Sequence, residues 1–318
     1  MEERELGRSG VTVSRIILGC GNFGGIGSAP AFFGAGETEP EAHALLDAAW
    51  EAGITTFDTA DAYGGGRSEA YIGSWLRTKG PEVRDRIVLT TKTFNPMAEG
   101  GDRGLAPERV HRQIRTSLDR LGVDAVPLYL AHAMDAETPV GETIGAFAEL
   151  AAAGLIRAYG GSNVDVEWLE EALAAGDPAW AQNSYSLLDR EDEGGVLDLC
   201  TRAGLGYTPH SPLAGGWLTG KYRRGEPVPA GSRMTLRPEP YRQFESDPVY
   251  DALEAFEARA AELGTTPAAL ALAWLLAQPR VTAVVIGPRR PEHLEPALAA
   301  LELVLQDDAR DELAELFP

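Results

Sequence analysis

The stretch GCGNFGGIGSAPAFFGAG, residues 19–36, decides between two folds for this chain. Its glycines at positions 19, 21 and 24 match the G-x-G-x-x-G pattern, which marks the phosphate-binding turn of a doubly wound open sheet. In that fold a helix begins within the pattern, whereas here residues 26–36 continue as a run rich in Gly, Ala and Pro. The glycine match is therefore weak support for a doubly wound sheet.

The rest of the chain alternates short apolar runs with helical patterns. One such pattern places Val110, Ile114, Leu118 and Leu121 on a single face behind Pro107. Another places Leu253, Phe256, Ala260 and Leu263 on one apolar face. The predicted strands are Arg15–Gly19, Thr55–Asp58, Ile87–Lys92, Ala125–His132, Ile156–Ser162, Trp180–Ser184, Leu205–Ser211 and Val281–Gly287. Strands that are apolar throughout are buried on both faces, as in a parallel sheet with helical crossovers. About eight strand–helix units therefore predict an α/β fold, the (β/α)8 TIM barrel.

Three further features complete the predicted architecture. A β-hairpin over residues 6–13 precedes the first strand of the barrel. Long insertions follow the first strand, at residues 24–39, and the seventh, at residues 217–247. Both belong to the C-terminal face, where barrel active sites are built. We expect residues 1–318 to form a single domain.

Composition narrows the classes of partner. The chain of 318 residues carries 28 basic and 48 acidic side chains, a net charge of −20, which argues against nucleic-acid or anionic-membrane partners. Cys20 and Cys200 lack metal-ligand spacing and are predicted to be buried thiols without a metal. The N-terminus has no apolar leader, and the most apolar segment, Pro267–Ala277, is too short to span a bilayer. A soluble, cytoplasmic protein is expected.

Polar side chains stand at consecutive strand ends of the predicted barrel. Asp58, Lys92 and His132 end strands two to four, and Tyr63 follows Asp58 on the adjoining loop. Ser162, Asn163 and Gln182 occupy the next two strands. Each alone has an ordinary explanation, such as a turn cap, a solvated charge or a core histidine. Together they predict one pocket, because strand ends converge at the C-terminal face of a barrel.

Six segments resemble one known family. They are FDTADAYG (57–64), IVLTTK (87–92), LYLAHAMD (128–135), GGSN (160–163), AQNSYSLLDR (181–190) and SPLAGGWLTGKY (211–222). Their sequences and order, between about residues 6 and 301, are similar to the aldo-keto reductase superfamily, and more narrowly to its bacterial branch that resembles potassium-channel β-subunits. The resemblance implies a (β/α)8 barrel that transfers hydride between NADP(H) and an aldehyde, ketone or sugar carbonyl, without a metal.

The resemblance also implies catalytic roles. Tyr63 matches the general acid that protonates the carbonyl oxygen, and His132 matches the group that orients this oxygen. A free phenol has a pKa of about 10, so a neighbouring cation is needed to lower it. Lys92 matches that cation, with Asp58 as its ion-pair partner.

Cofactor-binding positions carry over in the same way, and Ser162, Asn163 and Gln182 match the ligands of the nicotinamide carboxamide. NADPH is the expected cofactor, with NADH as the alternative. Arg289 and His293 stand where the family binds the adenosine 2′-phosphate, and Lys221 and Arg233 would add charge near the pyrophosphate. The full set implied by the resemblance is Gly21, Asn22, Asp58, Ser162, Asn163, Gln182, His210, Ser211, Pro212, Leu213, Gly215, Lys221, Arg233, Gly287, Arg289 and His293.

The sequence departs from the family at three places. His210 replaces the usual aromatic ring that stacks on the nicotinamide, and because imidazole titrates near neutral pH we expect cofactor binding to vary with pH. Pro296 and Ala297 replace an acid–amide pair that holds the adenine, which weakens the preference for NADPH over NADH. The two phenylalanines of the first insertion, at positions 32 and 33, could line the substrate pocket or form a surface lid.

Other interpretations stay open at this point. An NADPH-binding sensor similar to the channel β-subunits would need little turnover, and a barrel aldolase would use Lys92 for a Schiff base. Trp50 and Trp75 are predicted core residues, whereas Trp217 and Tyr222 flank the predicted cofactor loop. The physiological substrate, the reaction direction and the oligomeric state are not determined, and a homo-oligomer is compatible with the sequence.

Overall fold

The short apolar runs form a closed parallel sheet. The computed structural model describes residues 1–317, and within them eight parallel strands pair in the order β10-β3-β4-β5-β6-β7-β8-β9. Two hydrogen bonds close the ring beside β9 and β10, from Thr282 N to Tyr207 O and from Val285 N to Pro209 O, each 2.9 Å long. The strands are β3 (Ile16–Gly19), β4 (Thr56–Asp58), β5 (Val88–Thr93), β6 (Val126–Ala131), β7 (Ile156–Ser162), β8 (Trp180–Gln182), β9 (Gly206–Tyr207) and β10 (Val284–Ile286). The predicted barrel is confirmed.

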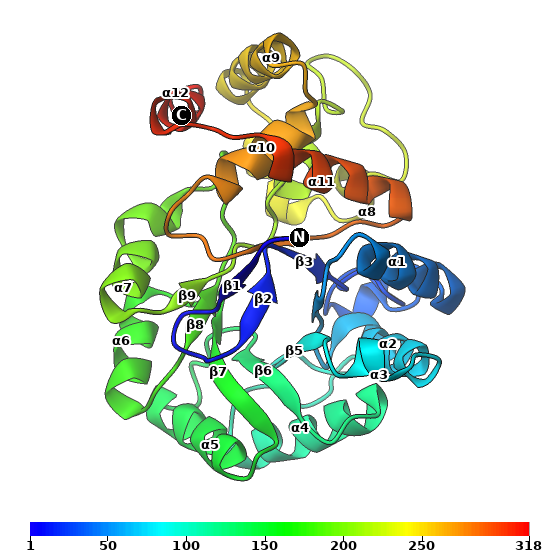
Figure 1. Cartoon of the computed structure of the whole chain (residues 1–318), viewed down its shortest axis with the longest axis vertical. Helices are drawn as coiled ribbons and strands as arrows, with labels where there is room; N and C mark the ends of the chain where they lie inside the picture. The colour runs from blue at the N-terminus through cyan, green and yellow to red at the C-terminus, as the bar shows by residue number, and fades with distance from the viewer. Residues whose placement is uncertain (318) are drawn as a thin grey trace.

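Helices surround this sheet (Figure 1). The longer ones are α1 (Glu39–Glu51), α2 (Arg67–Arg77), α4 (Pro107–Leu121), α5 (Val140–Ala152), α6 (Val166–Ala175), α7 (Val196–Ala203), α9 (Asp247–Glu262), α10 (Pro267–Leu276), α11 (Glu295–Glu302) and α12 (Asp307–Glu315). Helix α4 shows why they form: its predicted apolar face is buried, and it ends at Gly122, whose φ of 69° terminates the helix. The Thr266 hydroxyl caps α10 by accepting a hydrogen bond from Ala269 N at 3.2 Å.

The N-terminal hairpin closes one end of the barrel. Strands β1 (Glu3–Glu5) and β2 (Thr12–Ser14) pair antiparallel, as predicted, and lie in front of the barrel in Figure 1. Leu6 and Val13 pack in one cluster with inward-facing residues such as Ile17, Leu128 and Trp180. Because this end is covered, we expect the ligand site at the opposite face, where the strands end.

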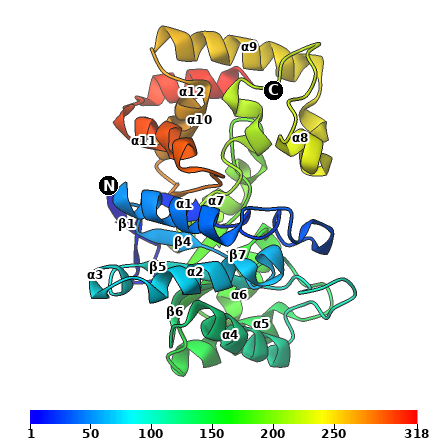
Figure 2. The same ribbon diagram turned by 90° about the vertical axis from the view of Figure 1, so that its right-hand side faces the viewer.

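Both long insertions lie at that opposite face. In Figure 2 the loops after β3 and β5 and the short helix α8 (Arg233–Leu236) project to the side away from the N-terminus. One 3₁₀ segment, Ala214–Thr219, leads into the second insertion, and another, Glu239–Phe244, lies within it. Arg237 Nη1 donates to Ile26 O at 3.3 Å, so the two insertions touch above the barrel.

Three details differ from the sequence-based predictions. Strand β9 is shorter than predicted, because Pro209 cannot donate a ladder hydrogen bond and Ser211 has a φ of 55°. Leu263, assigned to the apolar face of α9, is 42% exposed because the helix ends at Glu262. Trp75 is buried as predicted, but Trp50 is only half-buried, with the Arg86 guanidinium 5.5 Å from the centre of its ring. No helix within residues 1–317 has the length and apolarity needed to cross a bilayer.

Candidate active site

The ends of β4, β5 and β6 bring three predicted catalytic side chains together. Asp58 is the last residue of β4, Lys92 lies near the end of β5, and His132 directly follows β6. All three are at least nine-tenths buried, with exposed fractions of 2%, 1% and 9%. A carboxylate and an ammonium at such depth need each other, because an unpaired buried charge is costly.

Lys92 is the centre of the cluster. Its Nζ donates to Asp58 Oδ1, to Thr59 O at 3.0 Å and to the Tyr63 hydroxyl at 3.3 Å. An ammonium has three donors and no acceptor, so each of its hydrogens has a partner and the Tyr63 oxygen is the acceptor. Burial lowers the pKa of Lys92, but Asp58 and Tyr63 raise it more, and the net pKa lies above its usual value. The hydroxyl hydrogen of Tyr63 is therefore left to donate elsewhere.

The loop that carries Tyr63 depends on glycine. Tyr63 begins a 3₁₀ turn that continues through Gly64, whose φ is 59°. A Cβ at Gly64 would lie 2.5 Å from Phe23 O, so only glycine allows this close approach to the first insertion. Gly21 lies against the phenol, since a Cβ there would be 3.6 Å from the Tyr63 ring.

The pKa of Tyr63 departs from the sequence-based prediction. Lys92 lowers this pKa, as predicted, but burial raises it more and Asp58 adds to the increase, so the net pKa is above the usual value. The phenol is therefore fully protonated at neutral pH. Its oxygen is held by the hydrogen bond from Lys92, and the group keeps a proton that it can donate instead of being already partly ionised.

His132 lies edge-on to Tyr63, with ring centres 5.3 Å apart. Burial lowers the pKa of His132 well below its usual value. The Lys92 ammonium lowers it further, and so does His210 when it is protonated. The His132 imidazole is therefore neutral. Its Nδ1 atom is buried and has no hydrogen-bond partner among residues 1–317. A neutral imidazole beside the phenol can donate one hydrogen bond to a carbonyl oxygen.

The predicted carboxamide ligands are close together, and all three already take part in hydrogen bonds within the protein. Gln182 Nε2 donates to Asp58 Oδ2 at 2.9 Å, which supports the carboxylate of the catalytic cluster. Asn163 Nδ2 donates to His132 O at 2.9 Å and to Ser162 Oγ at 3.2 Å. Within the described chain, the non-glycine residues with positive φ are Asn163, Ser211 and Ala214. Such strained backbone is typical of binding sites, and all three lie in or beside predicted cofactor positions.

His210 requires a correction of the predicted pH dependence. Its Nε2 is 2.9 Å from Asn163 Oδ1, and its Nδ1 is 3.1 Å from Ser211 Oγ. Burial lowers the pKa of His210 to about 4, with a further contribution from Lys92. The ring is therefore neutral from about pH 6 upwards, and any effect of its titration on cofactor binding falls well below neutral pH.

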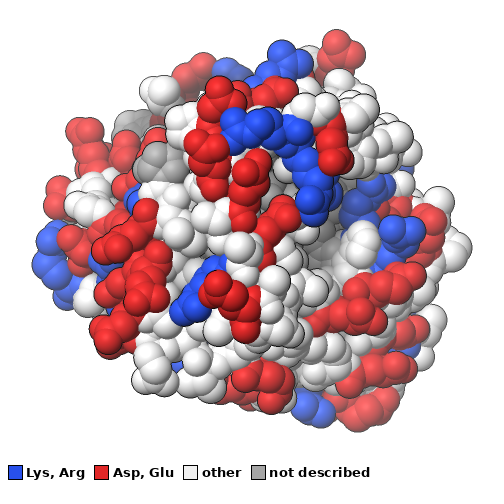
Figure 3. All heavy atoms as spheres, turned by 90° about the horizontal axis from the view of Figure 1, so that it is seen from above, with Lys and Arg blue, Asp and Glu red and all other residues white. Residues whose placement is uncertain are grey.

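A group of cations lies beside the turn of residues 211–215. Arg233 Nη2 donates to Asn22 Oδ1 at 3.2 Å, which joins a predicted cofactor residue of the second insertion to one that follows β3 directly before the first insertion. Burial lowers the pKa of Lys221, and the nearby Arg233 and Arg289 lower it further. Three cations this close together repel one another, so an anion between them would be stabilised. The surface of the chain is otherwise strongly acidic: on the α9 side, seen in Figure 3, Asp and Glu side chains cover much of the surface and Lys and Arg side chains lie among them.

Arg289, after β10, does not stand free. Its Nε donates to Glu37 Oε1 at 2.6 Å, its Nη1 to Gly231 O at 3.4 Å, and its backbone N to His293 Nδ1 at 3.3 Å. Gly287 is exposed, and a Cβ there would meet nothing within 4 Å. Pro296 lies in the first turn of α11 and Ala297 is buried, so neither position offers a side-chain hydrogen bond to an adenine.

A family model described as the aldo/keto reductase family matches residues 15–317. The chain belongs to this family. It is accordingly an oxidoreductase of carbonyl compounds that uses NAD(P)H. The left-handed residues, the cation group and the unpartnered Nδ1 of His132 fit such a dinucleotide and a carbonyl beside it.

Three relatives of this reductase illustrate the range of the family. The oxidoreductase YrpG of Bacillus subtilis is 35% identical, with 100% of this chain and 96% of the relative covered. The NADH-specific methylglyoxal reductase of Escherichia coli is 34% identical, covering 96% and 95%. A probable voltage-gated potassium channel subunit beta of Oryza sativa is 33% identical, covering 96% and 92%. A glycerol dehydrogenase structure from Gluconobacter oxydans shares the fold, with a TM-score of 0.84 at 24% identity over 99% of this chain and 94% of the other.

Sequence reasoning missed a buried network behind the predicted catalytic cluster of Asp58, Tyr63, Lys92 and His132. Asp61 Oδ2 accepts from Thr93 Oγ1 at 2.7 Å, and Arg109 Nη1 donates to the same hydroxyl at 2.8 Å. Arg120 Nη1 donates to Glu69 Oε2 at 3.0 Å and to Asp61 O at 3.3 Å. These bonds anchor both sides of the Tyr63 loop. The signal was present in the sequence, because both acids lie in the segment around Tyr63.

The remaining aromatic residues of the insertions have mainly structural contacts. Trp217 and Tyr222 are buried and pack together with ring centres 5.0 Å apart, and the Tyr222 hydroxyl donates to Gly215 O at 3.2 Å. Phe32 lies under the Arg237 guanidinium, 5.6 Å from it. Phe33 lies against Gly65, where a Cβ would be 2.9 Å from its ring, so it is close to the Tyr63 loop.

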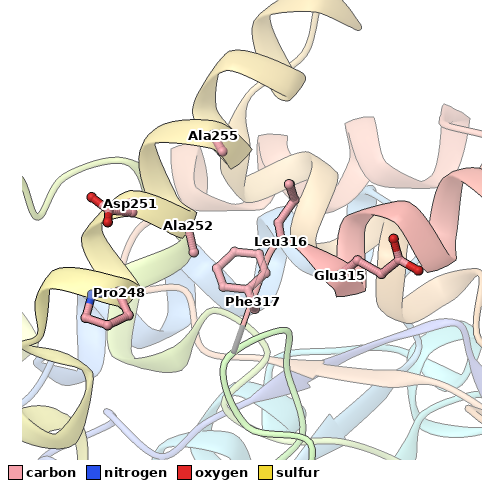
Figure 4. Close-up of a pocket in the computed structure, with 7 residues that line it drawn as sticks. All are labelled: Pro248, Asp251, Ala252, Ala255, Glu315, Leu316 and Phe317. Carbon is pink, nitrogen blue, oxygen red and sulfur yellow. The ribbon is translucent and has the colours of Figure 1, made fainter.

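A surface groove lies away from the predicted site residues. It has a volume of about 420 Å³ and runs between α9 and the C-terminal segment. Figure 4 shows its lining, which includes Pro248, Asp251, Glu315 and Phe317 and no predicted site residue.

Proposed function

We propose that this reductase transfers hydride from NADPH or NADH to the carbonyl carbon of a small aldehyde, ketone or sugar, with Tyr63 as the proton donor. The observation that supports this most strongly is the Lys92 ammonium, whose three hydrogens all have acceptors and one of which is the Tyr63 oxygen. Since the phenol oxygen accepts from Lys92, its own hydrogen points away from the ammonium. The carbonyl oxygen of a substrate bound between Tyr63 and His132 would accept a hydrogen bond from the Tyr63 hydroxyl.

Each side chain then has a defined task. Asp58 and Gln182 hold Lys92 in place, and Lys92 stabilises negative charge on the phenol oxygen as its proton leaves. His132, neutral and next to Tyr63, orients the carbonyl oxygen by a second hydrogen bond. The bound nicotinamide supplies the hydride. In the reverse direction the ionised Tyr63 oxygen, stabilised by Lys92, would accept the proton from an alcohol while the hydride returns to the nicotinamide.

Residues from several segments at the C-terminal face of the barrel would hold the dinucleotide. Ser162, Asn163 and the free Gln182 oxygen offer acceptors and donors for the carboxamide, and the His210 ring can stack on the nicotinamide. Backbone N–H groups of the turn of residues 211–215 would bind the pyrophosphate, with Lys221 and Arg233 adding charge. Gly21, Asn22, Gly287, Arg289 and His293 complete the proposed site. The expected preference for NADPH depends on Arg289, and this side chain is paired with Glu37.

Turnover tests the proposal against a sensor that binds cofactor without reaction. We expect oxidation of NADH or NADPH when the reductase is given small aldehydes, ketones or keto-sugars, with methylglyoxal included because one relative is named for it. The Tyr63→Phe variant should bind the dinucleotide but lose this turnover. Cofactor binding with no turnover of any carbonyl would favour the sensor instead.

The aldolase alternative has a separate test. A Schiff base needs an unprotonated amine. Burial lowers the pKa of Lys92, but Asp58 and Tyr63 raise it more, so the net pKa is above its usual value and the amine is protonated. Borohydride treatment with carbonyl compounds should therefore leave Lys92 unmodified. A covalent adduct on Lys92 would contradict the proposed role.

A further inference from the structure

Glu37 lies where the two insertions meet the predicted cofactor residues. Its backbone N donates to Asn22 O at 2.9 Å, and its carbonyl accepts from Gly24 N at 2.8 Å. The side chain is 5% exposed, so its position is fixed by backbone on both sides and by packing. An acid at this depth, in a chain where most acids are solvated, calls for a specific role.

The two carboxylate oxygens of Glu37 have different surroundings. Oε1 accepts from Arg289 Nε at 2.6 Å, whereas Oε2 is buried with no hydrogen-bond partner among residues 1–317. Burial raises the pKa of Glu37, and Arg289 opposes this increase. Glu37 thus depends on one guanidinium for charge compensation and keeps one acceptor atom for a donor that the protein does not provide.

Glu37 and Arg289 differ in which adenosine group they would bind, the 2′-phosphate of NADPH or the ribose hydroxyls of NADH. An arginine near the adenosine ribose favours a 2′-phosphate, whereas a carboxylate there accepts hydrogen bonds from ribose hydroxyls. Here both are present, and the carboxylate already occupies the arginine. A phosphate dianion reaching Arg289 would lie beside the Glu37 carboxylate and would have to compete with it for the guanidinium. A ribose diol would instead supply the donor that Oε2 lacks.

We propose that Glu37 sets the cofactor choice of this reductase toward NADH: its carboxylate occupies Arg289, accepts the adenosine ribose hydroxyls and disfavours the 2′-phosphate of NADPH. This inference rests on the proposed function, because it requires the adenosine ribose to lie at Arg289. It makes Glu37 a specificity-determining residue outside the catalytic cluster, contributed by the first insertion.

The test is the ratio of dissociation constants for NADPH and NADH, measured by titration calorimetry at pH 8 and constant ionic strength. In wild type NADH should bind more tightly. In Glu37→Gln, which keeps the shape of the side chain, the ratio should move at least tenfold toward NADPH. Glu51→Gln removes one exposed acid from the far end of α1 and should change the ratio less than twofold. An unchanged ratio in Glu37→Gln overturns the inference.

A second measurement uses the wild-type protein, so its result does not depend on whether the Glu37→Gln variant folds. Wild type should bind adenosine 5′-phosphate at least as tightly as adenosine 2′,5′-bisphosphate, and a bisphosphate that binds tenfold more tightly would contradict the inference. Binding of both dinucleotides with no selectivity change in Glu37→Gln would leave the proposed function intact and remove only Glu37. Failure of wild type to bind either dinucleotide would contradict both proposals.

Discussion

The catalytic cluster and the cation group differ in how the fold holds them. Asp58, Lys92 and His132 stand on neighbouring strand ends and are almost wholly buried. Lys221, Arg233 and Arg289 come from the second insertion and the segment after β10, and they are exposed or half-buried. Buried strand-end groups cannot move without breaking the barrel, whereas groups on insertions can adjust to a ligand. We therefore expect the first region to control turnover and stability, and the second to control binding.

The largest expected effect is on turnover. Tyr63→Phe removes the proton donor but keeps the ring, so kcat should fall by about 10³-fold, within the range for general acid catalysis. The dissociation constant of the dinucleotide should change less than twofold, because the hydroxyl contacts Lys92 and not the cation group. Steady-state kinetics and calorimetry on the same preparation check this. A variant with more than a tenth of wild-type kcat would remove Tyr63 from the mechanism.

The second-largest expected effect is on the free energy of unfolding, which should fall more when the buried region is changed than when the insertions are. Asp58→Asn leaves the Lys92 ammonium buried without its countercharge, and we expect the free energy of unfolding to fall by about 3 kcal/mol. Glu37→Gln leaves an arginine that reaches solvent, and the loss should be below about 1 kcal/mol. Denaturant unfolding of both variants measures the difference. Equal losses would show that the two ion pairs are held alike.

A change in the cation group of Lys221, Arg233 and Arg289 should weaken dinucleotide binding and leave turnover nearly unchanged. Arg233→Gln removes one cation and its bond to Asn22, and the dissociation constant of the dinucleotide should rise about tenfold with kcat within twofold of wild type. Arg259→Gln, on the exposed surface of α9, is the matched control and should leave both constants unchanged. A fall in kcat as large as the loss of binding would contradict the division between the regions.

The smallest expected effect concerns His210 and pH. Its pKa is about 4 in the folded protein and about 6.5 in an unfolded chain. As pH falls from about 6.5 to 4, the unfolded chain takes up a proton that the folded protein does not, so the unfolding free energy should fall relative to His210→Gln. We expect a difference on the order of 1 kcal/mol, because the ring is partly exposed. Parallel stability curves over this range would contradict the lowered pKa.

That the proposed catalytic residues meet was predictable from the sequence, because the parallel barrel places successive strand ends in one ring. Asp58 and Lys92, separated by 34 positions, had to become neighbours once both were assigned to strand ends. The pKa of Tyr63 was not predictable, since it depends on how deeply the loop is buried. The sequence identified the cation Lys92 but not the larger effect of burial.

The insertions were the part that could not be predicted. Glu37 and Arg289 are 252 positions apart, and nothing in a pattern of short loops fixes which side chains meet above a barrel. The same limit explains Trp50, whose spacing suited the core but whose ring is partly covered by a surface arginine. Strand periodicity constrains neighbours in a sheet, whereas loop contacts depend on the details of each turn.

A double-mutant cycle in kcat tests most directly the central claim that Lys92 acts through Tyr63. Tyr63→Phe and Lys92→Met should each lower kcat by about 10²- to 10³-fold, and the double variant should be no more than about threefold below Tyr63→Phe, because residues that act as one unit are not additive. Dinucleotide binding should stay close to wild type in all three. A double variant whose loss equals the product of the single losses would show that the two residues act independently and would contradict the account.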